Sequence, residues 1–202
     1  MLTSVHINRF EDIITLTKRI FDLIMALGLM LILAPLFLLV VLAVMLTSVG
    51  PVLFRTRRSG KNSRLFTMYK FRTMRMDTPQ VATHLLKNPD QFLTPVGAFL
   101  RRTSLDELPQ LINVLRGDMS LVGPRPALFN QEDLIALRAG SGVDALIPGI
   151  TGWAQVNGRD ELPILEKVKL DVWYMKNRSF WFDVKILVMT AFKVLRKDGV
   201  SH

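Results

Sequence analysis

The 202-residue sequence contains no cysteine, which excludes disulfide bonds and thiolate metal sites and permits a reducing compartment without requiring one. Three motifs of common metal and phosphate enzymes are also missing: HExxH, the Walker loop and GxGxxG. The missing Walker loop argues against an ordinary kinase or ATPase. The sequence has no internal repeat or low-complexity tract, and its length suits one domain with a real hydrophobic core.

Acidic residues are scarce relative to basic ones. Lysine and arginine number 26 against 17 aspartates and glutamates, which gives a net charge of +9. This balance favours an anionic partner, such as nucleic acid, an anionic membrane surface or a phosphorylated substrate. Hydrophobic residues make up 50% of the chain and the mean hydropathy is +0.29, so we expect part of it to meet lipid.

Charge is nearly absent from residues 20–49, where Asp22 is the only charged residue. The 24 residues from Leu23 to Leu46 carry no charge. At about 1.5 Å per residue they could form a membrane-spanning helix. This segment is the expected membrane element of the chain.

Two features favour a re-entrant path for this segment over a simple span. Pro35 lies at its middle, where proline breaks or kinks a helix. Lys18 and Arg19 precede the segment and further cations at 55–64 follow it, whereas a spanning helix normally has its basic excess on one side. We therefore expect a helix that enters the membrane, breaks at Pro35 and returns to the same face. A kinked single span is the alternative.

Residues 51–75 contain eight basic residues and no acid. Residues 52–54 and 65–69 are expected to form two short strands around a turn at 59–63. The cations of this hairpin suit either simple solvation or contact with anionic lipid headgroups. An anionic membrane surface is favoured over nucleic acid as the partner of this patch, because an apolar segment lies immediately beside it.

Lys70 and Arg72 alternate with aromatic residues, and we predict that they bind a substrate phosphate. Further along, helices are expected at 130–139, 161–176 and 181–195. The last of these is basic and aromatic, which fits an interfacial helix or packing on the core. The predicted fold is α+β and predominantly helical, with a short β-hairpin and amphipathic interfacial helices.

The centre of the sequence is an adjacent acid pair, Asp106 and Glu107, flanked by Arg101 and Arg125. Neighbouring residues on a helix point about 100° apart, so the two acids cannot share one task. Ser104 and Glu107 match the spacing of a capping box, so one interpretation is that these residues only cap a helix.

The other interpretation is chemical. A carboxylate at a helix N-terminus is held ionised and can attack phosphorus, as in enzymes that form an aspartyl phosphate. Arg101 and Arg125 could then offset the charge of the phosphoryl oxygens. Mg²⁺ would be held by one or two carboxylates together with phosphate oxygens and water. Spacing by itself leaves both interpretations open.

Four motifs carry a resemblance to a known family: YKFRTM (69–74), LDELPQ (105–110), GDMSLVGPRP (117–126) and PGITGWAQVNGR (148–159). In this order they resemble the monotopic phosphoglycosyl transferases, the bacterial sugar transferase family. The resemblance covers roughly residues 15–200. In its length and its single hydrophobic segment, the chain is similar to the small, minimal-core members of that family.

The resemblance implies a phosphoglycosyl transferase on the cytoplasmic face of the bacterial inner membrane. Such an enzyme moves a sugar-1-phosphate from a UDP-sugar to polyprenyl (undecaprenyl) phosphate, releases UMP and starts a surface glycan. It further implies that Asp106 is the nucleophile of a covalent intermediate and a Mg²⁺ ligand, assisted by Glu107. The implied organisation is an N-terminal leader (1–19), a re-entrant membrane helix (20–49) and a catalytic domain (50–202).

By the same resemblance, Arg101 and Arg125 bind phosphates, with Pro124 and Pro126 bracing Arg125. Gln155 and Arg159 are expected near the uridine. The family breaks its membrane helix at a Ser-Pro pair, whereas this chain has Ala34-Pro35. The sugar and the oligomeric state are not indicated.

Two other functions remain open at this point. One is a non-catalytic scaffold at the membrane surface that binds nucleotide or lipid. The other is an anchored protein that binds nucleic acid through residues 55–75. The complete set of acids and arginines favours the enzyme, since a scaffold does not need them together.

Overall fold

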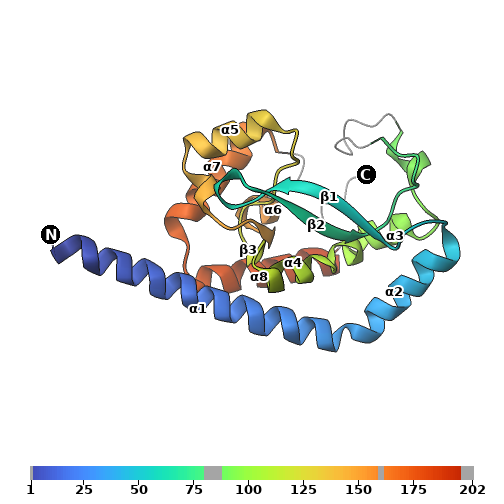
Figure 1. The fold of residues 1–202 in the computed structure, drawn as a ribbon, viewed down its shortest axis with the longest axis horizontal. Helices are drawn as coiled ribbons and strands as arrows, with labels where there is room; N and C mark the ends of the chain where they lie inside the picture. Colours follow the sequence, from blue (N-terminus) through green and yellow to red (C-terminus); the bar gives the residue numbers. More distant parts are fainter. Residues whose placement is uncertain (1, 80–87, 159–161, 197–202) are drawn as a thin grey trace.

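The first two helices of the computed structural model form a bent pair, α1 (Leu2–Ile32) and α2 (Ala34–Thr47), inclined to each other by 63° (Figure 1). The structure describes residues 2–79, 88–158 and 162–196. The helix breaks at Leu33, and Pro35 occupies the first turn of α2. Backbone N–H groups in a first turn have no partner within the helix, so the missing N–H of Pro35 costs no hydrogen bond. The break expected around Pro35 is therefore present, two residues earlier.

Within the described residues, no helix is by itself long and apolar enough to cross a membrane. Residues 15–32 and 34–47 together meet that criterion as a bent pair, by length and composition. Helix α1 is continuous from Leu2, so the expected leader and the start of the apolar segment belong to one helix. Large apolar side chains on both helices are exposed, among them Leu31, Ile32 and Leu46.

Helix α1 runs along the rest of the molecule beside α4 (Gln110–Arg116) and α8 (Phe180–Arg196) (Figure 1). Arg19 donates hydrogen bonds to the carbonyls of Val114 (2.6 Å) and Leu115 (3.0 Å) near the C-terminus of α4. Lys18 pairs with Asp183 of α8. The two cations that precede the apolar segment are thus engaged within the protein.

The predicted hairpin is confirmed. Strands β1 (Leu53–Ser59) and β2 (Leu65–Phe71) pair antiparallel, with Phe54 opposite Lys70, and a 3-10 turn, η1 (Lys61–Ser63), joins them. Met68 and Phe71 of β2 are buried in the core. The hairpin therefore carries Lys70 on a strand whose position is fixed by packing.

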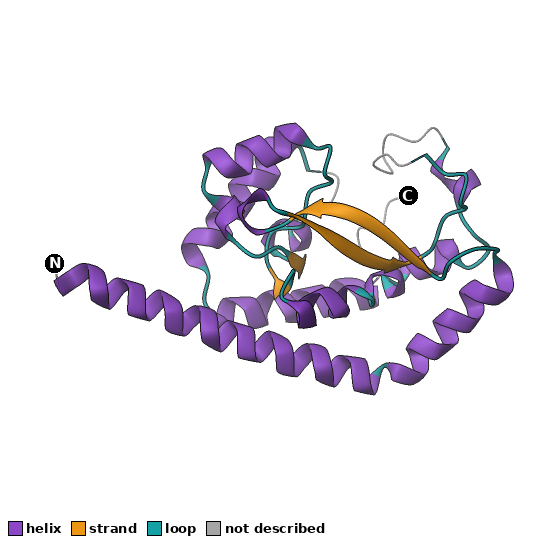
Figure 2. Ribbon diagram, in the orientation of Figure 1, coloured by secondary structure: helices purple, strands orange, loops and turns teal. Residues whose placement is uncertain are grey.

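A second, two-stranded sheet was not expected (Figure 2). Strands β3 (Ser120–Val122) and β4 (Gly149–Thr151) pair in parallel. The segment between them contains α5 (Glu132–Gly140) and a 3-10 turn, η5 (Val143–Ala145). A Cβ atom on Gly149 would lie 2.1 Å from the amide nitrogen of Gly123, so this close approach requires glycine.

The remaining elements complete a mostly helical domain. They are η3 (Pro89–Phe92), α3 (Gly97–Arg102), η4 (Leu105–Glu107), α6 (Trp153–Val156) and α7 (Ile164–Asn177). The three helices expected in the C-terminal half are confirmed as α5, α7 and α8. Helices α7 and α8 pack around β3 and α4, where Val114, Met119 and Ile186 are fully buried or nearly so, whereas α5 packs against α7 through Leu134 and Val168.

Candidate active site

The acid pair lies in η4, the one-turn 3-10 helix that precedes α4. Ser104, just before it, has a left-handed backbone with φ of 56°, an uncommon conformation for a residue other than glycine. Ser104 makes no capping hydrogen bond, and α4 begins after Pro109 without a side-chain cap. The capping-box interpretation is therefore wrong. The left-handed residue instead turns the chain so that Asp106 is buried, with 7% of its surface exposed.

Strand β2 brings Lys70 to both acids. Its Nζ lies 2.7 Å from Glu107 Oε1 and 3.8 Å from Asp106 Oδ2. Arg125 approaches the same Glu107 oxygen, with its Nη2 at 3.0 Å. Four residues that the sequence singled out thus meet in one cluster, in which Glu107 binds two cations and Asp106 faces one.

Asn113 of α4 fixes the strand that carries Lys70. Its Oδ1 accepts a hydrogen bond from Tyr69 N (3.1 Å), and its Nδ2 donates to the Thr67 carbonyl (2.7 Å). Asn113 is completely buried. Sequence reasoning missed this residue, although a lone amide inside the apolar pattern of a helix was a usable signal.

The two acids differ in electrostatic environment. Burial by itself would raise the pKa of Glu107, but Lys70 and Arg125 outweigh it and hold that pKa far below its usual range. At Asp106 burial dominates and raises the pKa, with Lys70 as the strongest opposing influence. Glu107 is thus an ionised anchor for cations, while the charge of Asp106 depends on its surroundings, a division of roles typical of paired catalytic carboxylates.

Arg101 occupies the last turn of α3 and faces the cluster from another side. Its Nε donates to Thr73 Oγ1 at 3.0 Å. Burial lowers the pKa of Arg101, and the charge of Asp106 counteracts that effect. The arginine is thus placed to interact with Asp106 electrostatically while a hydroxyl holds its side chain.

The structure places Arg72 elsewhere. Its buried guanidinium donates to the Ser48 carbonyl (2.8 Å) and hydroxyl (2.9 Å) and to the Val49 carbonyl, just after α2 ends. It also borders a cavity of about 400 Å³ with Thr47 and Thr94. In this arrangement Arg72 ties the exit of the bent helix pair to the hairpin, and it does not join the acid cluster.

The two residues expected near a uridine have different outcomes. Gln155 lies on α6, is 8% exposed, and neither atom of its amide group has a hydrogen-bond partner within the part of the chain that the structure describes. Buried amides are normally bonded, so this group is available to a ligand. Arg159 lies outside the described residues.

A divalent cation has suitable donors at the acid pair. Across the described ranges, no group of three or more His, Cys, Asp or Glu side chains forms a metal cage. Mg²⁺ often uses only one or two carboxylates and takes its other ligands from substrate phosphates and water. Asp106 and Glu107 fit that donor set.

The site is an acid pair, one member buried and the other partly buried, among lysine and arginine side chains, on a domain joined to a bent apolar helix pair. The family model described as bacterial sugar transferase matches residues 13–197. The chain belongs to the bacterial sugar transferase family, and the family and enzyme class expected from its motifs are confirmed.

Characterised and uncharacterised relatives agree with this assignment. The uncharacterized sugar transferase EpsL of Bacillus subtilis is 44% identical, over 92% of this chain and 90% of the relative. The UDP-glucose:undecaprenyl-phosphate glucose-1-phosphate transferase of Escherichia coli is 46% identical over 88% of this chain and 40% of the relative. The undecaprenyl-phosphate galactose phosphotransferase of Salmonella typhimurium is 38% identical over 98% of this chain and 44% of the relative. The chain thus spans less than half the length of the Escherichia coli and Salmonella typhimurium relatives.

Proposed function

We propose that this chain transfers a sugar-1-phosphate from a UDP-sugar to undecaprenyl phosphate, releasing UMP, as the first step in assembly of a bacterial surface glycan. The relatives named for glucose or galactose transfer to undecaprenyl phosphate support the donor and acceptor classes. The observation that carries the proposal is the position of the buried Asp106 beside Lys70. Glu107 forms ion pairs with Lys70 and Arg125.

The reaction has two displacements at one phosphorus. A carboxylate oxygen of Asp106 attacks the phosphorus that bears the sugar, the bond from that phosphorus to the UMP oxygen breaks, and UMP leaves with the electron pair. The covalent product is an aspartyl phosphosugar. A phosphate oxygen of undecaprenyl phosphate then attacks the same phosphorus, and the Asp106 carboxylate leaves. The final product is undecaprenyl diphosphate sugar, and no proton, oxidant or reductant is consumed.

The neighbouring side chains have separate tasks in this proposal. Lys70 and Arg101 favour the ionised form of Asp106, because their charges lower its pKa against the larger effect of burial. Arg125, braced by Pro124 and Pro126, binds the phosphate oxygens, since a guanidinium suits bidentate contact. Asp106 and Glu107 would hold Mg²⁺, which when bound offsets the negative charge of the diphosphate.

The uridine is assigned to Gln155 and Arg159. The unpartnered buried amide of Gln155 supports this assignment, because a uracil ring offers both a donor and acceptors for it. Arg72 remains a candidate for the acceptor phosphate, since it borders the cavity next to the end of α2.

A screen for UMP release tests the proposal. Purified protein, undecaprenyl phosphate and Mg²⁺ are combined with each member of a UDP-sugar panel, and UMP is measured. We expect release with at least one donor, dependent on acceptor for multiple turnovers. Binding of UDP-sugar without UMP release from any donor would support the non-catalytic scaffold instead.

The same proposal places the protein on the cytoplasmic face of the inner membrane, with α1 and α2 as a re-entrant pair. The exposed apolar side chains on both helices and their 63° bend support this placement. The exposed hairpin arginines, Arg55, Arg57 and Arg64, would contact anionic headgroups. Cysteines introduced at Val5 and Lys61 should both react with a reagent confined to the cytoplasmic side, and labelling from opposite sides would mean a true span.

A further inference from the structure

The segment Pro124–Pro126 depends on its carbonyl groups for anchoring. Pro124 and Pro126 have no backbone N–H, so neither can donate a hydrogen bond. Yet this segment must place the Arg125 side chain against Glu107, at 3.0 Å. What holds its carbonyls therefore determines where Arg125 lies.

Each of the three carbonyls accepts a hydrogen bond from a different element. The Pro124 carbonyl accepts from Gly149 N of β4 (3.0 Å). The Arg125 carbonyl accepts from Arg138 Nη1 of α5 (2.7 Å), and the Pro126 carbonyl accepts from Arg58 Nη1 of β1 (3.3 Å). The shortest of the three is the bond to Arg125 itself.

Arg138 is in turn fixed by a buried acid on a fourth element. Its Nε and Nη2 donate to Asp171 Oδ2 of α7 at 3.0 and 2.7 Å. Asp171 is 1% exposed and Arg138 is 9% exposed. One guanidinium therefore uses two edges, one for Asp171 and one for the Arg125 carbonyl, which a lysine ammonium cannot reproduce in the same geometry.

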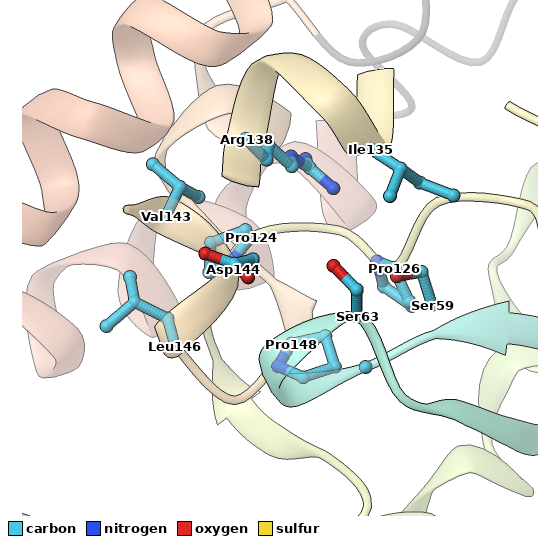
Figure 3. Close-up of a pocket in the computed structure, with 11 residues that line it drawn as sticks. Ser59, Ser63, Pro124, Pro126, Ile135, Arg138, Val143, Asp144, Leu146 and Pro148 are labelled. Atoms are coloured by element: carbon cyan, nitrogen blue, oxygen red, sulfur yellow. The ribbon is translucent and has the colours of Figure 1, made fainter. Parts of the chain in front are cut away.

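Figure 3 shows Arg138 on α5 next to Pro124 and Pro126, at a cavity of about 30 Å³ that these residues border. The space is enough for about one or two water molecules. The two prolines are buried, and the three hydrogen bonds to their segment add directed contacts to this packing.

We infer that Arg138 and Asp171 form a positioning pair for the proposed reaction: Asp171 orients Arg138, and Arg138 holds the Arg125 backbone so that the Arg125 guanidinium reaches the substrate phosphate. The inference rests on the proposed function for the phosphate role of Arg125. Neither residue touches the reacting atoms. A displacement of about 1 Å at a substrate-binding group can cost about a hundredfold in rate, so small movements of this loop matter.

A double-mutant cycle separates this role from simple stabilisation. Arg138→Lys is made in the wild-type protein and in Arg125→Met, and kcat/KM for UMP release and the melting temperature are measured for all four proteins. We expect Arg138→Lys to lower kcat/KM at least about tenfold in the wild type and less than about twofold in Arg125→Met, because the group it positions is then gone. Lys169→Gln, which breaks an exposed ion pair on α7, is the control and should change neither value.

An equal loss in both backgrounds would overturn the inference and leave the pair a stabilising contact between α5 and α7. Asp171→Asn, which keeps the size of the side chain, provides the same comparison should Arg138→Lys fail to fold.

A second readout needs no turnover. The ¹⁵Nε resonance of Arg125, assigned by its loss in Arg125→Met, should shift in Arg138→Lys and stay in place in Lys169→Gln. An unmoved resonance would contradict the positioning role even where UMP is released. Absence of UMP release by the wild type, together with a shifted resonance, would reject the proposed function and keep the positioning role.

Discussion

Replacing Lys70 by methionine should impair the enzyme in a pH-dependent manner. Lys70 Nζ lies 3.8 Å from Asp106 Oδ2, and at an effective dielectric constant of about 20 this attraction is worth about 4 kcal/mol. Glu107 shares the same ammonium, and Arg101 and Arg125 remain in the variant. We therefore expect the ionised form of Asp106 to lose roughly 1.4–3 kcal/mol, a factor of about 10 to 150.

The sign of the pH effect follows from burial. Burial raises the pKa of Asp106 and Lys70 opposes that shift, so the pKa rises further once Lys70 is gone. A nucleophilic carboxylate acts only when ionised, and a smaller fraction is then ionised at any given acidic or neutral pH. The acidic limb of the profile should move to higher pH, and activity should recover as the solution becomes more alkaline.

The assay is kcat/KM for UMP release from about pH 5 to about pH 9. Lys70→Arg keeps the positive charge and should leave the acidic limb near its wild-type position. Lys169→Gln, which removes a lysine from an exposed ion pair, is the control for a change in the net charge of the protein. An unchanged acidic limb and unchanged activity in Lys70→Met would refute the electrostatic role of this lysine.

Three other changes test separate parts of the structure. Arg125→Lys should lower kcat/KM at least about tenfold, because a point charge cannot reproduce a two-pronged contact with phosphate; a near-normal rate would remove that role. Asn113→Ala should lower the free energy of unfolding by about 2 kcal/mol in denaturant titration, since it leaves Tyr69 N and the Thr67 carbonyl without a buried partner. Arg19→Met should lower the free energy of unfolding by about 1–3 kcal/mol, because two hydrogen bonds to the end of α4 are lost. An unchanged melting temperature would contradict this expectation.

The features that sequence predicted well are those encoded locally. Proline in an apolar run predicted the break between α1 and α2, and two short strands around a polar turn predicted the hairpin. Asp106, Glu107 and Arg125 were found by motif, and the structure brings them together with Lys70. Spacing by itself also suggested a helix cap at Ser104, which the left-handed backbone there rules out.

The features that sequence missed depend on partners far apart in the chain. Arg138 and Asp171 are 33 positions apart, and neither stands in the acid-bearing motif. Strand β3 has three residues, too few to show an alternating pattern, and its pairing with β4 joins residues about thirty positions apart. Arg72 looked like its neighbour Lys70, but in the fold it binds the carbonyls after α2. Only the tertiary structure shows that Lys70 belongs to the acid cluster and that Arg72 does not.

The central claim, that Asp106 is the nucleophile, is tested most directly by peptide mass spectrometry of the covalent intermediate. Wild-type protein is mixed with a UDP-sugar without acceptor, stopped quickly and digested with trypsin, which releases residues 103–116 as one peptide. This peptide should carry the added mass of one sugar phosphate, with fragmentation placing it on Asp106, and Asp106→Asn should show no adduct. An adduct on another residue, or UMP release that persists in Asp106→Asn, would contradict the account.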